Sequence, residues 1–110
     1  MKIFTYENIK NTEANKLFED LGYELVQDTI LEVSYKKIDK IFTWASDEII
    51  FFEWGEELEI NVAHIEHGRP RGSLNILPLI YPITKLCEEL NIDIEKTYLE
   101  SKENKDEDIK

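Results

Sequence analysis

Residues 48–54 constrain the fold more than any other part of this 110-residue chain, because they are typical of a strand that is apolar on both sides. Successive side chains of a strand point to opposite faces of a sheet. The apolar residues are Ile49 and Phe51 on one face, and Ile50, Phe52 and Trp54 on the other. An antiparallel sheet usually exposes one face to water. We therefore expect two covers: helices on one face, and a further segment, a second subunit or a partner on the other.

The strand belongs to a predicted meander of about five antiparallel strands. Its segments are rich in β-branched and aromatic residues, and turn signals at residues 46–47 and 55–57 separate the last three. Residues 37–40 predict a polar turn, and the glycines and proline of residues 66–73 predict a loop. The lead-in at residues 2–7 is either a short strand or irregular. The predicted strands are residues 23–27, 30–36, 41–45, 48–54 and 58–65.

An amphipathic helix of about ten residues is predicted before the first strand. Asn11 or Thr12 is suited to its N-cap, and Gly22 to the glycine position that ends a helix. Its apolar residues follow the i, i+3, i+4, i+7 spacing and are Ala14, Leu17, Phe18 and Leu21.

A second helix is predicted within residues 74–91. Proline costs about 3 kcal/mol inside a helix, so this helix either begins near Pro82 or is kinked there. Residues 92–99 form either a short extra helix or a packed extension. The apolar stripe of the second helix is Ile83, Leu86, Cys87 and Leu90.

The order of these elements predicts an α+β fold, in which an antiparallel sheet of about five strands carries an N-terminal and a C-terminal helix on one face. No linker or repeat divides the chain, so residues 1–99 are expected to form a single domain. Residues 100–110 hold five acids and three lysines, which predicts a disordered charged tail.

The chain is acidic. Thirteen basic and 24 acidic residues give a net charge of −11, which disfavours direct binding to nucleic acid or to an anionic membrane. The charge serves either solubility or electrostatic steering toward a basic partner. No apolar run approaches the roughly 18 residues that span a bilayer, the N-terminus lacks a signal peptide, and Cys87 is a lone cysteine. We expect a cytoplasmic protein.

Two arginines form the first candidate site. Arg69 and Arg71 lie in the Gly/Pro loop and are the only arginines of the chain. Arginine grips carboxylate or phosphate with two parallel hydrogen bonds, so this pair is a candidate anion-binding site. The alternative is that the two charges offset the acidic surface of the domain itself.

The second candidate site is an aromatic patch around Trp44 and Trp54. If Phe42 and Trp44 share a sheet face with Phe52 and Trp54, these rings form either the main core or an exposed interaction surface. Acidic residues nearby would suit a basic protein partner or a homodimer. The predicted partner-binding residues are Trp44, Glu53, Trp54, Glu56, Glu57 and Glu59.

No motif indicates catalysis, a cofactor or a metal. His64, Glu66 and His67 have a spacing that does not bring three ligands together on a strand. Cys87 lies on an apolar helical stripe, where thiols are usually inert. No nucleophile and base have a recognisable spacing, and no glycine-rich phosphate loop follows a strand. We therefore expect a protein that is not an enzyme and needs no cofactor.

Residues 18–23, 35–36 and 85–90, with Ile41, together resemble a pattern in short, mostly uncharacterised acidic α+β proteins of Gram-positive bacteria and their phages and mobile elements. The resemblance extends over about residues 17–91. It implies a setting in which small acidic proteins act as inhibitors, either as toxin-immunity proteins or as phage anti-defence proteins of the anti-CRISPR type.

These observations lead to the hypothesis of a non-catalytic inhibitor that binds and blocks a basic, nucleic-acid-handling protein such as a nuclease or toxin. One alternative is a structural or regulatory subunit that self-associates through its second apolar sheet face. The other is an anion or small-ligand binder that uses Arg69 and Arg71.

Overall fold

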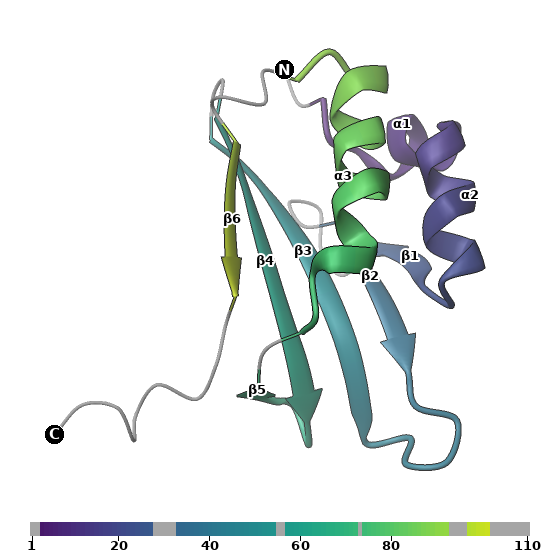
Figure 1. The fold of residues 1–110 in the computed structure, drawn as a ribbon, viewed down its shortest axis with the longest axis vertical. Helices are drawn as coiled ribbons and strands as arrows, with labels where there is room; N and C mark the ends of the chain where they lie inside the picture. The colour runs from purple at the N-terminus through teal and green to yellow at the C-terminus, as the bar shows by residue number, and fades with distance from the viewer. Residues whose placement is uncertain (1–2, 28–32, 55–56, 73, 93–96, 102–110) are drawn as a thin grey trace, which may run out of the picture.

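The computed structural model describes residues 3–27, 33–54, 57–72, 74–92 and 97–101. The chain forms a six-stranded sheet with helices on one of its faces (Figure 1). This confirms the predicted α+β class, with its antiparallel meander and helices near both ends. None of the helices in these ranges is long and apolar enough to cross a membrane. The elements are α1 (Tyr6–Lys10), α2 (Glu13–Asp20), β1 (Glu24–Gln27), β2 (Val33–Ile38), β3 (Ala45–Trp54), β4 (Glu57–Glu66), β5 (Arg69–Gly72), α3 (Leu77–Glu89) and β6 (Thr97–Ser101).

Five strands form the meander in the order β1-β2-β3-β4-β5, each antiparallel to the next. β6 is an addition to the predicted sheet and pairs in parallel with β4. It shares one edge of β4 with β5, which pairs at the other end of that strand. β6 occupies part of the segment for which a helix or a packed extension was expected. It continues to Ser101, so residues 100 and 101, which were predicted to begin the disordered tail, belong to a strand instead. Residues 102–110 of the predicted tail lie outside the described residues.

The core lies between the helices and the sheet. Tyr35 of β2 stacks on Phe18 of α2 with 4.0 Å between ring centroids. The hydroxyl of Tyr35 donates a 2.7 Å hydrogen bond to Asn15 Oδ1, and burial raises the pKa of this hydroxyl. The other buried apolar side chains include Ile9, Ile49, Phe51, Leu58, Ile60, Val62, Leu79 and Leu86.

α2 confirms the predicted helix and its caps. The Thr12 side chain accepts a hydrogen bond from Asn15 N, as an N-cap does. At the other end, Gly22 has φ +95° and its amide donates to the Glu19 carbonyl, while the next amide donates to Phe18. These two hydrogen bonds together form the Schellman motif, for which glycine is preferred.

α3 includes Pro82 in its interior, so the alternative in which the helix begins near that proline is wrong. The helix starts at Leu77 and has Pro78 in its first turn, where no amide donor is needed. Near its end, the Glu89 carboxylate accepts hydrogen bonds of 2.9 and 2.8 Å from the amides of Glu13 and Ala14. The first turn of α2 is thereby held against the last turn of α3.

The predicted strand at residues 41–45 is wrong. Asp39 Oδ1 accepts hydrogen bonds of 2.8 Å from the amides of both Ile41 and Phe42, so the backbone turns in this segment. Local capping by an aspartate therefore overrides the β-propensity of the apolar residues. β3 starts at Ala45 and contains Ser46, where a turn was predicted.

The predicted loop at residues 66–73 is also wrong, because most of it is a tight hairpin. His67 and Gly68 have φ of +51° and +79°, and the flanking residues Glu66 and Arg69 are paired. Two central residues with positive φ are the signature of the type I′ turn, whose twist suits a two-residue hairpin. Pro70 is tolerated in β5 because β5 lies at a sheet edge.

The sheet face away from the helices is largely shielded within the single chain. Ile50 and Phe52 are half-buried on this face, while Ser34, Asn61 and Ala63 are buried. None of the apolar side chains described on β3 and β4 is exposed. The large apolar patch expected on one sheet face is therefore not found among the described side chains of these strands.

Candidate functional site

Two turns lie side by side where the sheet extends beyond the helices (Figure 1). One joins β2 to β3 and the other joins β4 to β5. The amide of His67 donates a 2.9 Å hydrogen bond to the carbonyl of Trp44 and so links the turns directly. We call this end of the molecule, residues 38–44 and 67–71, the tip.

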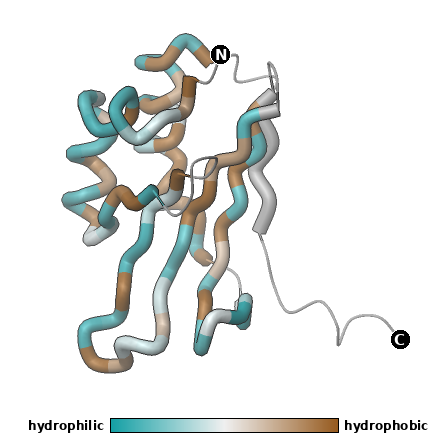
Figure 2. The backbone as a smooth tube through the Cα atoms, turned by 180° about the vertical axis from the view of Figure 1, so that it is seen from behind, coloured by the Kyte–Doolittle hydropathy of each residue, from teal (hydrophilic) through white to brown (hydrophobic). Residues whose placement is uncertain are grey.

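The tip exposes large apolar side chains. Figure 2 shows a hydrophobic stretch in the turn between β2 and β3. The exposed fractions are 81% for Ile41, 53% for Phe42, 56% for Ile38 and 46% for Trp44. Single exposed apolar residues are common on protein surfaces, but a contiguous group marks an interaction surface.

Hydrogen bonds hold this turn in one conformation. Besides binding two amides with its carboxylate, Asp39 donates its own amide to the Ala45 carbonyl over 2.9 Å. The Ala45 amide in turn donates to Phe42. The amides of Phe42 and Ile41 hold the pKa of the Asp39 carboxyl below its ordinary value. The apolar side chains therefore project from an ordered turn.

Aromatic stacking joins the two turns. The rings of Trp44 and His67 are nearly parallel, with an interplanar angle of 7° and 4.6 Å between centroids. The ring of Phe42 also lies near Trp44, with 5.4 Å between centroids and an interplanar angle of 46°. Aromatic residues held in this way lose little conformational entropy on binding, which favours protein recognition.

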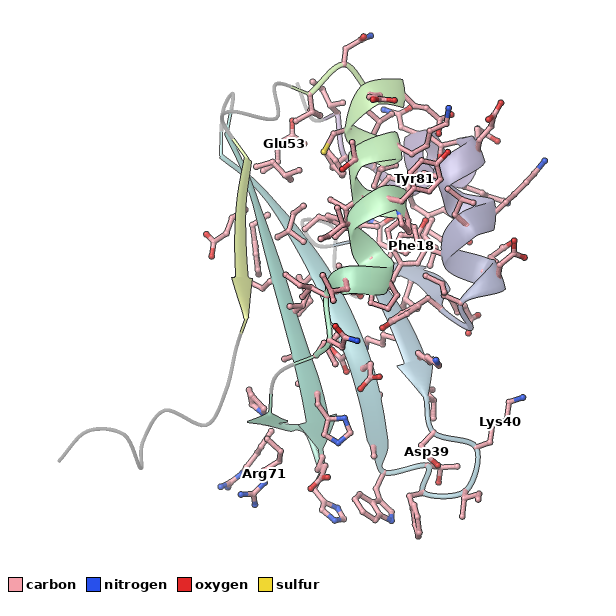
Figure 3. The ribbon with its side chains drawn as sticks, viewed as in Figure 1. Phe18, Asp39, Lys40, Glu53, Arg71 and Tyr81 are labelled. Atoms are coloured by element: carbon pink, nitrogen blue, oxygen red, sulfur yellow. The ribbon has the colours of Figure 1, made fainter. Side chains whose placement is uncertain are left out.

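The tip carries several cationic side chains. Arg69 and Arg71 both belong to β5, and Lys40 lies in the neighbouring turn. Within the described part of the chain, none of these three side chains takes part in a salt bridge. Figure 3 shows Lys40 and Arg71 at the same end of the molecule.

The carboxylates next to the tip are engaged by His64. Its Nδ1 lies 2.8 Å from Asp47 Oδ1, and its Nε2 lies 3.1 Å from Glu66 Oε2. These two hydrogen bonds, that to Asp47 first, raise the pKa of the His64 imidazole. In the described ranges, no group of three or more His, Cys, Asp and Glu side chains is arranged to hold a metal ion.

A pocket of about 490 Å³ lies between the end of α2 and the tip. His64 and Ser46 both line it, but they do not form a nucleophile and base: both ring nitrogens of His64 contact carboxylates, and Ser46 Oγ donates to Glu48 over 3.0 Å. The other charged residues of its wall are Asp20, Lys37, Asp39, Lys40 and Asp47.

Of the predicted partner-binding residues, Trp44 lies at the tip, whereas Glu53, Trp54, Glu57 and Glu59 lie at the opposite end of the β3–β4 pair. Trp44 precedes the first residue of β3, whereas Trp54 ends the strand and pairs with Glu57. Nine residue steps of a strand separate these ends by about 30 Å. Glu53 lies at the end away from the tip (Figure 3), Glu59 is half-buried on β4, and Glu56 lies outside the described residues.

Glu53 has a structural partner. Its carboxylate accepts hydrogen bonds of 3.0 and 2.9 Å from the amides of Ile3 and Phe4. The ring of Phe4 then stacks on Phe51 of the core at 5.2 Å. Glu53 thus anchors the N-terminal segment to the end of β3.

Sequence reasoning included Phe42 in the aromatic patch but did not place Ile41 or His67 beside it. Ile41 and Phe42 were assigned to a strand, and the signal that could have corrected this is Asp39, since an aspartate two residues ahead favours a turn. The signal for His67 is the following Gly68, because the two residues fit a type I′ turn.

Comparison of the chain with protein-family models, with curated proteins and with solved structures found no match.

Proposed function

We propose that this chain is a non-catalytic inhibitor that binds a partner protein through the tip. The observation that carries the proposal is the group of exposed apolar side chains on two ordered, mutually stacked turns. Binding hot spots are enriched in Trp, Tyr and Arg, and the tip supplies Trp44, Arg69 and Arg71. Beside the tip, Ser46 and His64 bind carboxylates instead of forming a nucleophile and base.

The partner we propose is a basic, nucleic-acid-handling protein such as a nuclease. A chain with a net charge of −11 attracts a basic surface over long distances, and such steering raises association rates by about ten to a thousandfold. Many acidic side chains are exposed on the helical side of the molecule, away from the tip. They include Glu7, Glu13 and Glu19.

The test compares a tip variant with a matched surface variant. Phe42→Ser with Trp44→Ser removes two exposed aromatic groups from the tip. Ile80→Ser with Tyr81→Ser removes two exposed apolar groups from α3 (Figure 3), with exposed fractions of 48% and 65%. Proteins captured from the native host's lysate by each variant are identified and assayed for nucleic-acid cleavage.

We expect the wild type and the α3 variant to capture and inhibit the same nucleic-acid-handling protein. The tip variant should lose this capture, and raised salt should slow association with the wild type. An unchanged capture by the tip variant, or a captured protein that retains full activity, would contradict the proposal.

Self-association is a second candidate, and a separate observation favours it. Leu77, Ile80 and Tyr81 are exposed on one side of α3 at the i, i+3, i+4 spacing. A homodimer through this stripe would persist at high salt because its contacts are apolar. Sedimentation of the α3 variant and the wild type over a range of concentrations separates the two candidates: a dimer lost only in the α3 variant favours self-association.

A further inference from the structure

Within the described ranges, the side chains of the two arginines of the tip form no salt bridge, which raises the question of what they bind. We infer that the tip recognises carboxylates that lie beside an apolar surface on the partner protein. Arg69 and Arg71 bind the carboxylates, while Phe42 and Trp44 contact the apolar surface. The inference rests on the proposed function and specifies the chemistry of the partner's site.

The anions at this end of the molecule already have partners within the chain, whereas the arginines do not form salt bridges in the described ranges. Asp47 and Glu66 share His64, and the Asp39 carboxylate is occupied by two backbone amides. The side chains of Arg69 and Arg71, by contrast, have no salt bridge within the described ranges. The positive charge available for an external ligand at the tip therefore lies on β5, together with Lys40 in the neighbouring turn.

Arg69 lies close to the aromatic group of the tip. Glu66 pairs with Ala45 on one side and with Arg69 on the other. Two strand spacings, or about 10 Å, thus separate the backbone of Arg69 from the start of β3, next to Trp44. A guanidinium and the aromatic group can therefore contact one recess of a partner at the same time.

The net charge of the chain and the stacking of Trp44 favour a protein carboxylate over a nucleic acid as the ligand of the tip. Arginines beside aromatic rings also suit single-stranded nucleic acid, whose bases stack on such rings. However, the net charge of −11 repels a polyanion, and one face of the Trp44 indole is covered by His67. This repulsion does not apply to isolated carboxylates on a basic partner protein, because the basic surface around them attracts the rest of this acidic chain.

Carboxylates surrounded by a basic surface occur in enzymes that act on nucleic acids. Such enzymes hold Mg²⁺ with one or two carboxylates, and the substrate phosphates complete the coordination. A site of this kind presents carboxylates within a basic groove. An acidic chain with a cationic tip is complementary to both parts, which explains why both arginines lie at the tip.

The experiment is an NMR titration of the ¹⁵N-labelled full chain with defined probes at about 1 mM, a concentration that detects weak binding. The probes are a short peptide in which Glu alternates with Leu, the same peptide with Gln in place of Glu, oligo-dT and inorganic phosphate. Each is repeated with Arg69→Gln/Arg71→Gln and with Lys10→Gln/Lys16→Gln, which removes two charges from α1 and α2 instead.

We expect the Glu peptide to shift the amide signals of residues 40–44 and 67–72, and the arginine variant to bind it about tenfold more weakly. The lysine variant should behave as the wild type. The inference is overturned if the Glu peptide leaves these signals unchanged, if the Gln peptide or phosphate shifts them equally, or if oligo-dT binds more tightly. Failure here, with capture that still depends on Phe42 and Trp44, would leave the proposed function intact.

Discussion

The indole of Trp44 lies flat on the imidazole of His67 and so connects two turns that are 23 residues apart in the chain. The His67→Asn variant tests this contact, since asparagine tolerates the positive φ of the turn but offers no ring. We expect the Trp44 indole N–H signal to move toward its random-coil position. An aromatic pair contributes about 0.5 to 1.5 kcal/mol, so the free energy of unfolding should fall by no more than this.

Gly68→Ala is the matched control for that experiment. A side chain at Gly68 has open space around it, but its φ of +79° is strained for alanine. This variant should lower stability while it preserves the indole signal. If His67→Asn leaves the indole signal unchanged, the stack does not position Trp44.

The second prediction concerns the pH dependence of stability through His64. Its pKa is raised in the folded protein, so its contribution to stability is fully present below the ordinary histidine pKa of about 6.5. The contribution is lost as the pH rises through the folded-state pKa. A neutral imidazole has only one N–H, so either Asp47 or Glu66 then loses its donor.

Urea unfolding between about pH 6 and pH 9 measures this effect. The wild type should become less stable across the upper part of this range, and His64→Gln should remove that part of the slope. A wild-type slope that persists unchanged in His64→Gln would show that another group is responsible.

The third prediction is that Glu53 stabilises the fold instead of contacting a partner. Glu53→Ala leaves the amides of Ile3 and Phe4 without an acceptor, which costs about 1 to 3 kcal/mol for part-buried donors. Glu59→Ala on β4 removes the same charge near the same end of the sheet. We expect a lower urea midpoint only for the Glu53 variant, and equal midpoints would be incompatible with an anchoring role.

The elements that sequence patterns predicted well are those specified by local signals. Thr12 and Gly22 mark the two ends of α2, and the spacing from Ala14 to Leu21 identifies its buried side. Each of these signals acts within one or two helical turns, so neighbouring residues are sufficient to determine the outcome.

The features that the patterns missed depend on single side chains or on distant pairing. The β-propensity of residues 41–45 was outweighed by one carboxylate, that of Asp39. β6 forms because β4 has an open edge beside residues 58–62, and nothing within residues 97–101 specifies that parallel partner. That Trp44 and the two arginines belong to one site was missed for the same reason, because Trp44 meets His67 only once both turns have formed.

The last prediction is that Asp39 keeps the tip ordered but contributes little to the stability of the fold. Its carboxyl has a lowered pKa because the amides of Phe42 and Ile41 donate to the ionised form. Its contribution is therefore present above the ordinary aspartate pKa of about 4 and is lost as the pH falls through the folded-state pKa. Asp39→Ala removes the acceptor at every pH. Asp20→Ala, at the end of α2, removes an exposed charge from the same pocket wall without touching the turn.

We expect Asp39→Ala to unfold at nearly the wild-type urea concentration, because the side chain is exposed. The amides of Ile41 and Phe42 should nevertheless exchange with solvent much faster, since they lose their acceptor. Partner capture should weaken along with this loss of order, because the apolar side chains must then be fixed on binding. If exchange accelerates while capture stays at the wild-type level, the tip is not the surface that binds.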